Sequence, residues 1–256
     1  MPTFVKRRRG APAGFFACEA AGLRWLSAAT DGVPCAHVIE YDDASLSLER
    51  LDSAAPTRTA ADEFGRRLAR THDAGARSFG SPPDGWTGPG YFGPLQNPLP
   101  MSFVGHDRWG TFYARERLAP MAERAAHQLN APAREAVAAV IARCEAGAFD
   151  DDDRPARLHG DLWSGNVMWT SGGVVLIDPA AHGGHRETDL AMLALFGCPF
   201  LDAVLDGYQQ HRPLGEGWRD RVALHQLYPL LAHVALFGGG YAGQASAAAA
   251  RVLQAS

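Results

Sequence analysis

The chain has little of what marks a membrane-bound, secreted or nucleic-acid-binding protein. No apolar run reaches the roughly 18–20 residues of a membrane span. Basic residues near the start are not followed directly by an apolar stretch, so they are not typical of a secretory signal. The formal net charge is −4, which gives no overall basic bias towards nucleic acid. We therefore expect neither a membrane partner nor a nucleic-acid partner.

Cysteine is also scarce. The four cysteines, Cys18, Cys35, Cys144 and Cys198, show no CxxC spacing, and three lie in apolar or helix-like surroundings. This favours small buried hydrophobic side chains over a structural disulfide, and a reducing cytoplasm is the expected compartment. Hydrophobic residues, by contrast, make up 46% of the 256 residues, which is ample for one large domain or two lobes.

The order of predicted elements indicates a small β-rich part followed by a larger helical part. A strand at 3–8 and a helix at 14–30 precede two strands within 35–51. Thr59 with Asp62 predicts a capping box for the next helix, which Gly75 ends. Later elements are helices at 108–129, kinked near Pro120, and at 132–146, a hairpin turned at 171–173, and helices from 188 onwards, interrupted at Pro199, Pro213, Pro229 and glycines 238–240.

Residues 75–107 contain seven glycines and six prolines with almost no periodicity, so we expect a long functional or mobile loop there. A GxGxxG match at 88–93 neither follows a predicted strand nor opens a helix, and we do not expect a phosphate loop. His182 and His185 stand in HGGH without a third ligand at suitable spacing, which makes a metal site the weaker interpretation.

One loop offers the groups that phosphoryl transfer needs. In RLHGDLWSGNVMW, residues 157–169, Asp161 stands five residues before Asn166, and the next hairpin returns Asp178 beside Asn166. A carboxylate can orient a substrate hydroxyl, and a second carboxylate with an amide oxygen can hold Mg²⁺. The catalytic loop of kinases has the same spacing and a metal-binding Asp after the next hairpin. A polar turn without a catalytic role is the weaker interpretation.

Longer stretches resemble the fructosamine kinase (ketosamine 3-kinase) family. LHGDLWSGNVMW, VLIDPAAHGGHRETDLAMLALFG, and FVK with CEAAGLRWL look like this family, and the similarity runs from about residue 4 to 243. The family is a branch of the kinase-like fold shared with aminoglycoside and choline phosphotransferases. The resemblance implies an α+β, two-lobed protein-kinase-like fold. Residues 1–52 would form a small β-rich, nucleotide-binding N-lobe, and 53–256 a larger, mainly helical C-lobe with the catalytic loop and the substrate site.

The resemblance also implies residues near the nucleotide. Lys6 matches the strand lysine that contacts the phosphates of ATP, and Glu19 matches the helix glutamate that pairs with this lysine. LSLERL matches the connector between the lobes, where the backbone of Glu49 and Leu51 would meet the adenine.

On the acceptor side, Asp161 becomes the catalytic base or hydroxyl-orienting group, and Asn166 and Asp178 become Mg²⁺ ligands, so ATP and Mg²⁺ are implied. Trp163 and His233 resemble elements of the substrate side, although a core histidine is an equal alternative for His233.

Two other features bear on the comparison with the family. His159 and Asp189 look like hydrogen-bonding residues that hold the loop.

Family members carry a helix and a hairpin before the lysine strand, and the hairpin turn covers the phosphates. Only five residues precede Lys6, too few for that hairpin. We expect either a start further upstream or a protein without this phosphate lid.

The expected function is ATP-dependent phosphorylation of a sugar hydroxyl on a ketosamine, such as a fructosamine or ribulosamine on a small amine or a glycated lysine, which leads to deglycation. The missing hairpin motivates an alternative, a degenerate, non-catalytic nucleotide-binding protein, and the intact set of Lys, Glu, Asp, Asn and Asp described above argues against it. A kinase for an aminoglycoside or amino alcohol is a third, although residues 80–107 lack the dense acidic cluster that suits a polycation. The sequence carries no signal for an oligomeric state.

Overall fold

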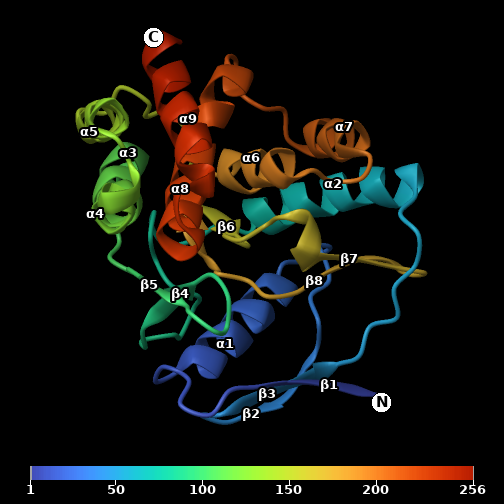
Figure 1. Ribbon diagram of the computed structural model, residues 1–256. Helices are drawn as coiled ribbons and strands as arrows, with labels where there is room; N and C mark the ends of the chain where they lie inside the picture. Colours follow the sequence, from blue (N-terminus) through green and yellow to red (C-terminus); the bar gives the residue numbers. More distant parts are fainter. Residues whose placement is uncertain (1, 256) are drawn as a thin grey trace.

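The computed structural model describes residues 2–255, and its N-terminal part is a three-stranded antiparallel sheet beside one helix (Figure 1). The strands lie in the order β1–β3–β2, and helix α1 packs on β2 and β3. The bounds are β1 Thr3–Arg7, α1 Phe15–Ser27, β2 Val38–Tyr41 and β3 Ser45–Glu49.

The turn between β2 and β3 is fixed by one carboxylate. Asp42 accepts hydrogen bonds from the Ala44 N–H (2.8 Å) and the Ser45 hydroxyl (3.0 Å), as short polar side chains do in tight turns. Beyond it, Leu46 and Leu48 are buried in the cluster that includes α1. The strands and the helix predicted in this part of the chain are confirmed.

Helix α2 (Arg58–Asp73) begins at a different cap from the one predicted. The side chain of Thr57, not Thr59, accepts the Ala60 N–H at 3.2 Å. Thr57 has the extended backbone of an N-cap, with φ of −128°, whereas Thr59 already lies in the first turn. The predicted stop is correct, because Gly75 adopts a left-handed φ of 73° just after the helix.

The sequence suggested a long loop without secondary structure at residues 75–107, but the structure contains a β-hairpin there. Strands β4 (Gly90–Phe92) and β5 (Leu99–Met101) pair into an antiparallel hairpin within it. Each strand has only three residues, which is too short for an alternating pattern to stand out among the glycines and prolines.

The C-terminal part is mainly helical and encloses two short antiparallel pairs, β6–β9 and β7–β8 (Figure 1). Within residues 2–255, no helix combines the length and the apolar character that a membrane crossing requires. The bounds are α3 Trp109–Phe112, the π-helix η1 Tyr113–Leu118, α4 Ala119–Ala125, η2 Ala126–Gln128, α5 Ala131–Glu145, β6 Ala156–Leu158, η3 Ser164–Asn166, β7 Val167–Thr170, β8 Gly173–Leu176, β9 His182–Gly184, α6 Glu187–Phe196, α7 Leu201–His211, α8 Trp218–Phe237, η4 Gly239–Tyr241 and α9 Ala242–Gln254.

Helix α8 runs through Pro229, where an interruption was predicted. A proline inside a helix leaves the carbonyl four residues earlier, here that of His225, without its usual donor. The buried Tyr113 hydroxyl is shared between this carbonyl (3.3 Å) and that of Leu224 (2.8 Å), and it accepts the Tyr228 N–H (3.2 Å). A side chain from η1 thus satisfies backbone groups beside the proline, and the helix continues.

Two hydrophobic clusters hold the chain together, and one of them spans the predicted boundary at residue 52. One lies among the C-terminal helices and includes Leu231. The other joins α1 and the N-terminal sheet to α2, α7 and the β7–β8 pair, through buried residues such as Leu46, Phe64 and Leu176. The N-terminal sheet therefore shares a core with part of the helical region, and lobes divided at 1–52 and 53–256 remain a proposal.

Candidate active site

A cavity of about 500 Å³ is lined by residues of β1, α1, the β4–β5 hairpin, the 161–180 segment and α8, and this volume is typical of small-molecule sites. Glu49 and Leu51 do not line it, and the Glu49 carboxylate instead accepts the His37 N–H (2.9 Å). The structure brings seven of the nine residues predicted from the sequence to this cavity: Lys6, Glu19, Asp161, Trp163, Asn166, Asp178 and His233.

The β4–β5 hairpin closes one side of the cavity. It is tied to the N-terminal part because the Tyr91 hydroxyl donates to the Ala13 carbonyl (2.8 Å) and the Arg8 guanidinium donates to the Leu95 carbonyl. Its residue Gln96 lines the cavity, and sequence reasoning did not single it out. The GxGxxG match thus lies in a hairpin beside the site, not between a strand and a helix.

Lys6 joins two carboxylates at the cavity. Its Nζ lies 2.6 Å from Glu19 Oε1 and also contacts Asp178. Lys6 and Glu19 are largely buried, with side chains 14% and 8% exposed. Burial lowers the pKa of Lys6, but the two carboxylates outweigh this and raise the pKa above its usual value. The lysine is therefore held charged at the edge of the cavity.

The catalytic-loop candidate is ordered by its own asparagine. Asn166 Nδ2 donates to the Asp161 carbonyl (2.8 Å) and lies 3.3 Å from Asp161 Oδ2. Burial raises the pKa of Asp161 to about 7, although the Asn166 amide opposes the shift. A carboxylate with this pKa can accept a proton near neutral pH.

Asp178 follows β8 and reaches the same place by hairpin geometry. The Ile177 N–H donates to the Asn166 carbonyl (3.2 Å), which sets the returning strand beside the loop. Asp178 has a left-handed φ of 55°, a strained conformation for a residue other than glycine and one that often occurs at functional sites. The Asp178 carboxylate and the Asn166 amide oxygen are hard oxygen donors at the cavity, so these two side chains fit Mg²⁺.

The buried carboxylate of Asp189, in α6, accepts hydrogen bonds from the backbone of the loop. Its Oδ2 accepts the His159 N–H (2.8 Å) and its Oδ1 accepts the Gly160 N–H (2.9 Å). Burial raises the pKa of Asp189, but its hydrogen-bond donors outweigh burial and lower it below the usual range. A buried carboxylate thus fixes the two residues that precede Asp161.

Trp163 and His233 line the cavity and pack against further aromatic side chains behind it. The His233 ring lies tilted against Phe196 and Tyr241, with ring centroids 4.8 and 4.9 Å away, and Trp163 meets Phe196 edge-on. His233 Nδ1 donates to the Pro229 carbonyl (2.7 Å), and burial lowers the pKa of this histidine. His233 is therefore a neutral ring whose other nitrogen is an acceptor.

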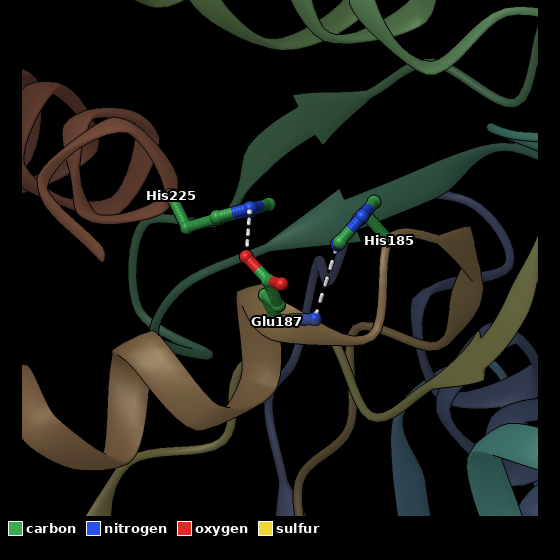
Figure 2. Close-up of side chains that lie close together, drawn as sticks. All are labelled: His185, Glu187 and His225. Carbon is green, nitrogen blue, oxygen red and sulfur yellow. Dashed lines mark hydrogen bonds and ion pairs between the residues drawn. The ribbon is translucent and has the colours of Figure 1, made fainter. Parts of the chain in front are cut away.

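A second group of potential metal ligands does not line this cavity. Ligand atoms of His185, Glu187 and His225 lie within 4.8 Å of one another (Figure 2). Glu187 is close to His185 in sequence, whereas His225 comes from α8 and is a partner that the HGGH spacing does not show. His182 is not among them, because its Nδ1 donates to the Ala180 carbonyl (2.8 Å).

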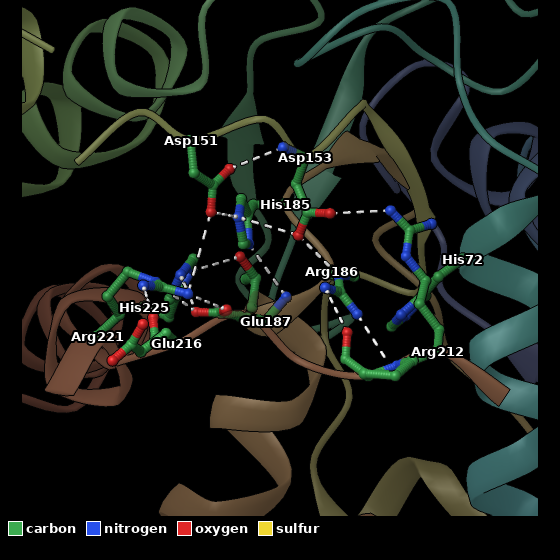
Figure 3. A network of polar contacts seen from close by, with 12 residues as sticks. His72, Asp151, Asp153, His185, Arg186, Glu187, Arg212, Glu216, Arg221 and His225 are labelled. Atoms are coloured by element: carbon green, nitrogen blue, oxygen red, sulfur yellow. Dashed lines mark hydrogen bonds and ion pairs between the residues drawn. The ribbon is translucent and has the colours of Figure 1, made fainter. Parts of the chain in front are cut away.

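The second group is part of an ion-pair network (Figure 3). Arg221 donates to both oxygens of Glu187, at 2.5 and 2.9 Å. Arg186 and Arg212 pair with Asp153 at 2.6 and 2.9 Å. Because these arginines already neutralise the carboxylates, a cation would have to displace a guanidinium, and we assign no metal here.

Comparisons with known proteins identify the relatives of this arrangement. The fructosamine kinase family matches residues 1–255. The chain belongs to the fructosamine kinase family. It is 35% identical over 250 residues to a Synechocystis protein named "probable ketoamine kinase", covering 94% of this chain and 80% of that protein.

Solved structures confirm the expected two-lobed, protein-kinase-like fold. A candidate fructosamine-3-kinase of Thermobifida fusca superposes with a TM-score of 0.89 at 47% identity, over 98% of this chain and 85% of that one. A choline/ethanolamine kinase family protein of Mesorhizobium loti shares the fold at 14% identity, with a TM-score of 0.63 over 99% of this chain and 86% of that one.

Proposed function

We propose that the protein transfers the γ-phosphoryl group of ATP to a sugar hydroxyl of a ketosamine, a fructosamine or ribulosamine. The observation that supports this most is the convergence of five groups on one cavity: Lys6, Glu19, Asp161, Asn166 and Asp178. Family membership supports ketoamine kinase chemistry. Phosphorylation at the 3-hydroxyl would destabilise the adduct and lead to deglycation.

Asp161 is the group that handles the substrate proton. Its carboxylate accepts the proton of the attacking hydroxyl as the new oxygen–phosphorus bond forms and the bond from phosphorus to the leaving ADP oxygen breaks. The pKa of about 7 keeps a useful fraction ionised near neutral pH. The Asn166 amide holds Asp161 in place through the bond to its backbone carbonyl.

The phosphates of ATP would be bound beside Lys6 and Glu19. Lys6 is charged, and Glu19 orients it towards the cavity while leaving other Nζ protons for phosphate oxygens. Asn166 and Asp178 would hold Mg²⁺, which when bound neutralises charge on the phosphates. Asp178 contacts Lys6 here, so the lysine that would bind the phosphates lies beside the carboxylate that would hold Mg²⁺.

The acceptor side suits the sugar part of a ketosamine, which is a neutral polyol. The carboxylates that line the cavity are Glu19, Asp161 and Asp178, and each already has a role at the donor or at the reacting hydroxyl. No carboxylate among the described lining residues remains for a polycationic antibiotic. Trp163 offers an apolar ring, and Gln96 and neutral His233 offer hydrogen bonds, which suits the C–H faces and hydroxyls of a sugar.

The test uses the purified protein with Mg-ATP and either fructosyl-lysine or ribulosyl-lysine. We expect a phosphorylated product by mass spectrometry, and none from Asp161→Asn. Thermal-shift titration with Mg-ATP is run in parallel. A protein that binds Mg-ATP but phosphorylates neither compound would refute the substrate assignment, and one that does not bind it would refute the kinase assignment.

A further inference from the structure

A buried hydrogen-bonded chain links helix α7 to the loop that carries Asp161. His72 Nδ1 lies 2.8 Å from the Tyr208 hydroxyl, and His72 Nε2 lies 3.2 Å from Asp189 Oδ2. All three residues are fully buried. Figure 3 shows His72 beside the ion-pair network that contains Arg186 and Arg212. None of these groups lines the cavity, so none touches substrate directly.

When the His72 ring is neutral, its two hydrogen-bond partners determine which ring nitrogen carries the proton. The ionised Asp189 can only accept, so His72 Nε2 carries the proton and donates to it. His72 Nδ1 is then an acceptor, and the Tyr208 hydroxyl donates to it. The hydroxyl therefore selects the ring tautomer that binds Asp189, because the other tautomer would direct a lone pair at the carboxylate.

Two glycines bring the helices close enough for this contact. A Cβ on Gly65 of α2 would lie 1.9 Å from the Val204 carbonyl oxygen, and a Cβ on Gly207 of α7 would lie 2.0 Å from the Asp62 carbonyl oxygen. Both distances are impossible for a real side chain, so each glycine permits the approach of the two backbones. His72 follows Gly65 by two helical turns, on the same face of α2.

The hydrogen-bonded series that starts at Tyr208 ends at the catalytic loop. Asp189 Oδ2 accepts from both His72 and the His159 N–H, and its Oδ1 accepts the Gly160 N–H. His159 Nδ1 in turn accepts the Asp161 N–H at 3.2 Å. A rotation of the Asp189 carboxylate would shift these amides together, and Asp161 with them.

We propose that His72 is a positioning residue for phosphoryl transfer. It locks the Asp189 carboxylate in the rotation that holds His159 and Gly160, and so sets the place of Asp161. The expected effect of His72 on turnover rests on the proposed kinase function. A second readout, exchange of the backbone amides within 157–162, needs no substrate and therefore separates failure of this proposal from failure of the proposed function.

The experiment compares two substitutions that keep different halves of the histidine. In His72→Gln the side-chain amide nitrogen reaches the place of Nε2 and can donate to Asp189. In His72→Asn the amide reaches only the place of Nδ1 and bonds Tyr208. Thr71→Val is the matched control, because buried Thr71 accepts the Val33 N–H (2.9 Å) and, within residues 2–255, its side chain makes no hydrogen bond with the loop.

For His72→Asn we expect kcat to fall about tenfold, the size of one lost hydrogen bond to a charged group, with an unchanged KM for Mg-ATP and faster exchange within 157–162. His72→Gln should recover most of both losses. Thr71→Val should lower the melting temperature but leave kcat and exchange at wild-type values.

Two results would overturn the proposal. One is wild-type kcat and exchange in His72→Asn, and the other is the same loss in His72→Asn, His72→Gln and Thr71→Val. If His72→Asn does not fold, Tyr208→Phe decides, since it removes only the hydroxyl that selects the tautomer. We expect a two- to threefold fall in kcat, scaled from half the effect of one hydrogen bond. Wild-type kcat and exchange in that variant would equally overturn the proposal.

Discussion

Replacing Glu19 with glutamine removes the charge of this side chain and keeps its size. In the wild type, Glu19 Oε1 lies 2.6 Å from Lys6 Nζ, and Lys6 also contacts Asp178. In the variant the lysine retains only the Asp178 carboxylate as a charged partner. We expect Lys6 to move towards Asp178, away from the donor phosphates and onto a proposed metal ligand.

The size of the effect follows from burial. A hydrogen bond between charged groups contributes about 1.5–3 kcal/mol, and this pair is largely buried. The remaining contact with Asp178 reduces the loss, so we use about 1.4–2 kcal/mol, which corresponds to about a ten- to thirtyfold fall in kcat/KM for Mg-ATP. Burial raises the pKa of Glu19, and the charge of Lys6 offsets only part of this rise. The fold therefore does not require Glu19 to be ionised. Stability should therefore stay within about 1 kcal/mol of the wild type.

Steady-state kinetics with varied Mg-ATP and urea denaturation measure the two quantities. Glu40→Gln is the matched control, because it makes the same chemical change at an exposed carboxylate that does not line the cavity. Equal kcat/KM values for Glu19→Gln and Glu40→Gln would refute the reasoning. So would a loss of activity that follows a loss of stability, since that would make the pair structural only.

Three further predictions concern the loop, the core and pH. Asp161→Asn should lower kcat by about 10²–10⁴-fold and keep the thermal shift with Mg-ATP; an unchanged rate would exclude Asp161 as the base. Tyr113→Phe should destabilise by about 2–3 kcal/mol in urea, because backbone groups beside Pro229 lose their partner, whereas Tyr91→Phe should cost under about 1 kcal/mol. Burial lowers the pKa of His225 from 6.5 to about 4, so the unfolded chain binds this proton first. Stability should be full above pH 6.5 and fall by up to about 3 kcal/mol towards pH 4, and a flat unfolding free energy over that range would contradict it.

Local chemistry made much of the fold and site predictable. Asp42 caps a turn whose partners lie two and three residues away. Asn166 bonds the backbone of Asp161 five residues earlier, and one hairpin returns Asp178. In such cases the chain between two groups is so short that few geometries exist, and sequence spacing carries the information. The cavity also contains Lys6 and Glu19, for which the resemblance to a family supplied what spacing could not.

The errors arose where a distant side chain changes a local rule. Pro229 was expected to interrupt a helix, and local rules alone support this. The partner that satisfies the backbone beside it, Tyr113, is more than a hundred residues away in sequence and reaches it from a π-helical turn. Thr57 is a different case, because its cap partner, Ala60, is local. Thr57 and Thr59 are both suitable caps by residue type, and the extended backbone of Thr57 decides between them.

His72 shows why a polar residue inside an amphipathic helix is difficult to assign from sequence. On α2 it is followed by Asp73, which pairs with Arg212 near the surface, so the sequence alone gives no reason to separate the two side chains. What separates them is the contact of α2 with α7, which Gly65 and Gly207 permit by removing side chains from the interface. A buried histidine with an acceptor on one nitrogen and a donor on the other has a defined tautomer. The functional information at His72 therefore lies in the helix packing, and changing Gly65 should disturb the loop as surely as changing His72.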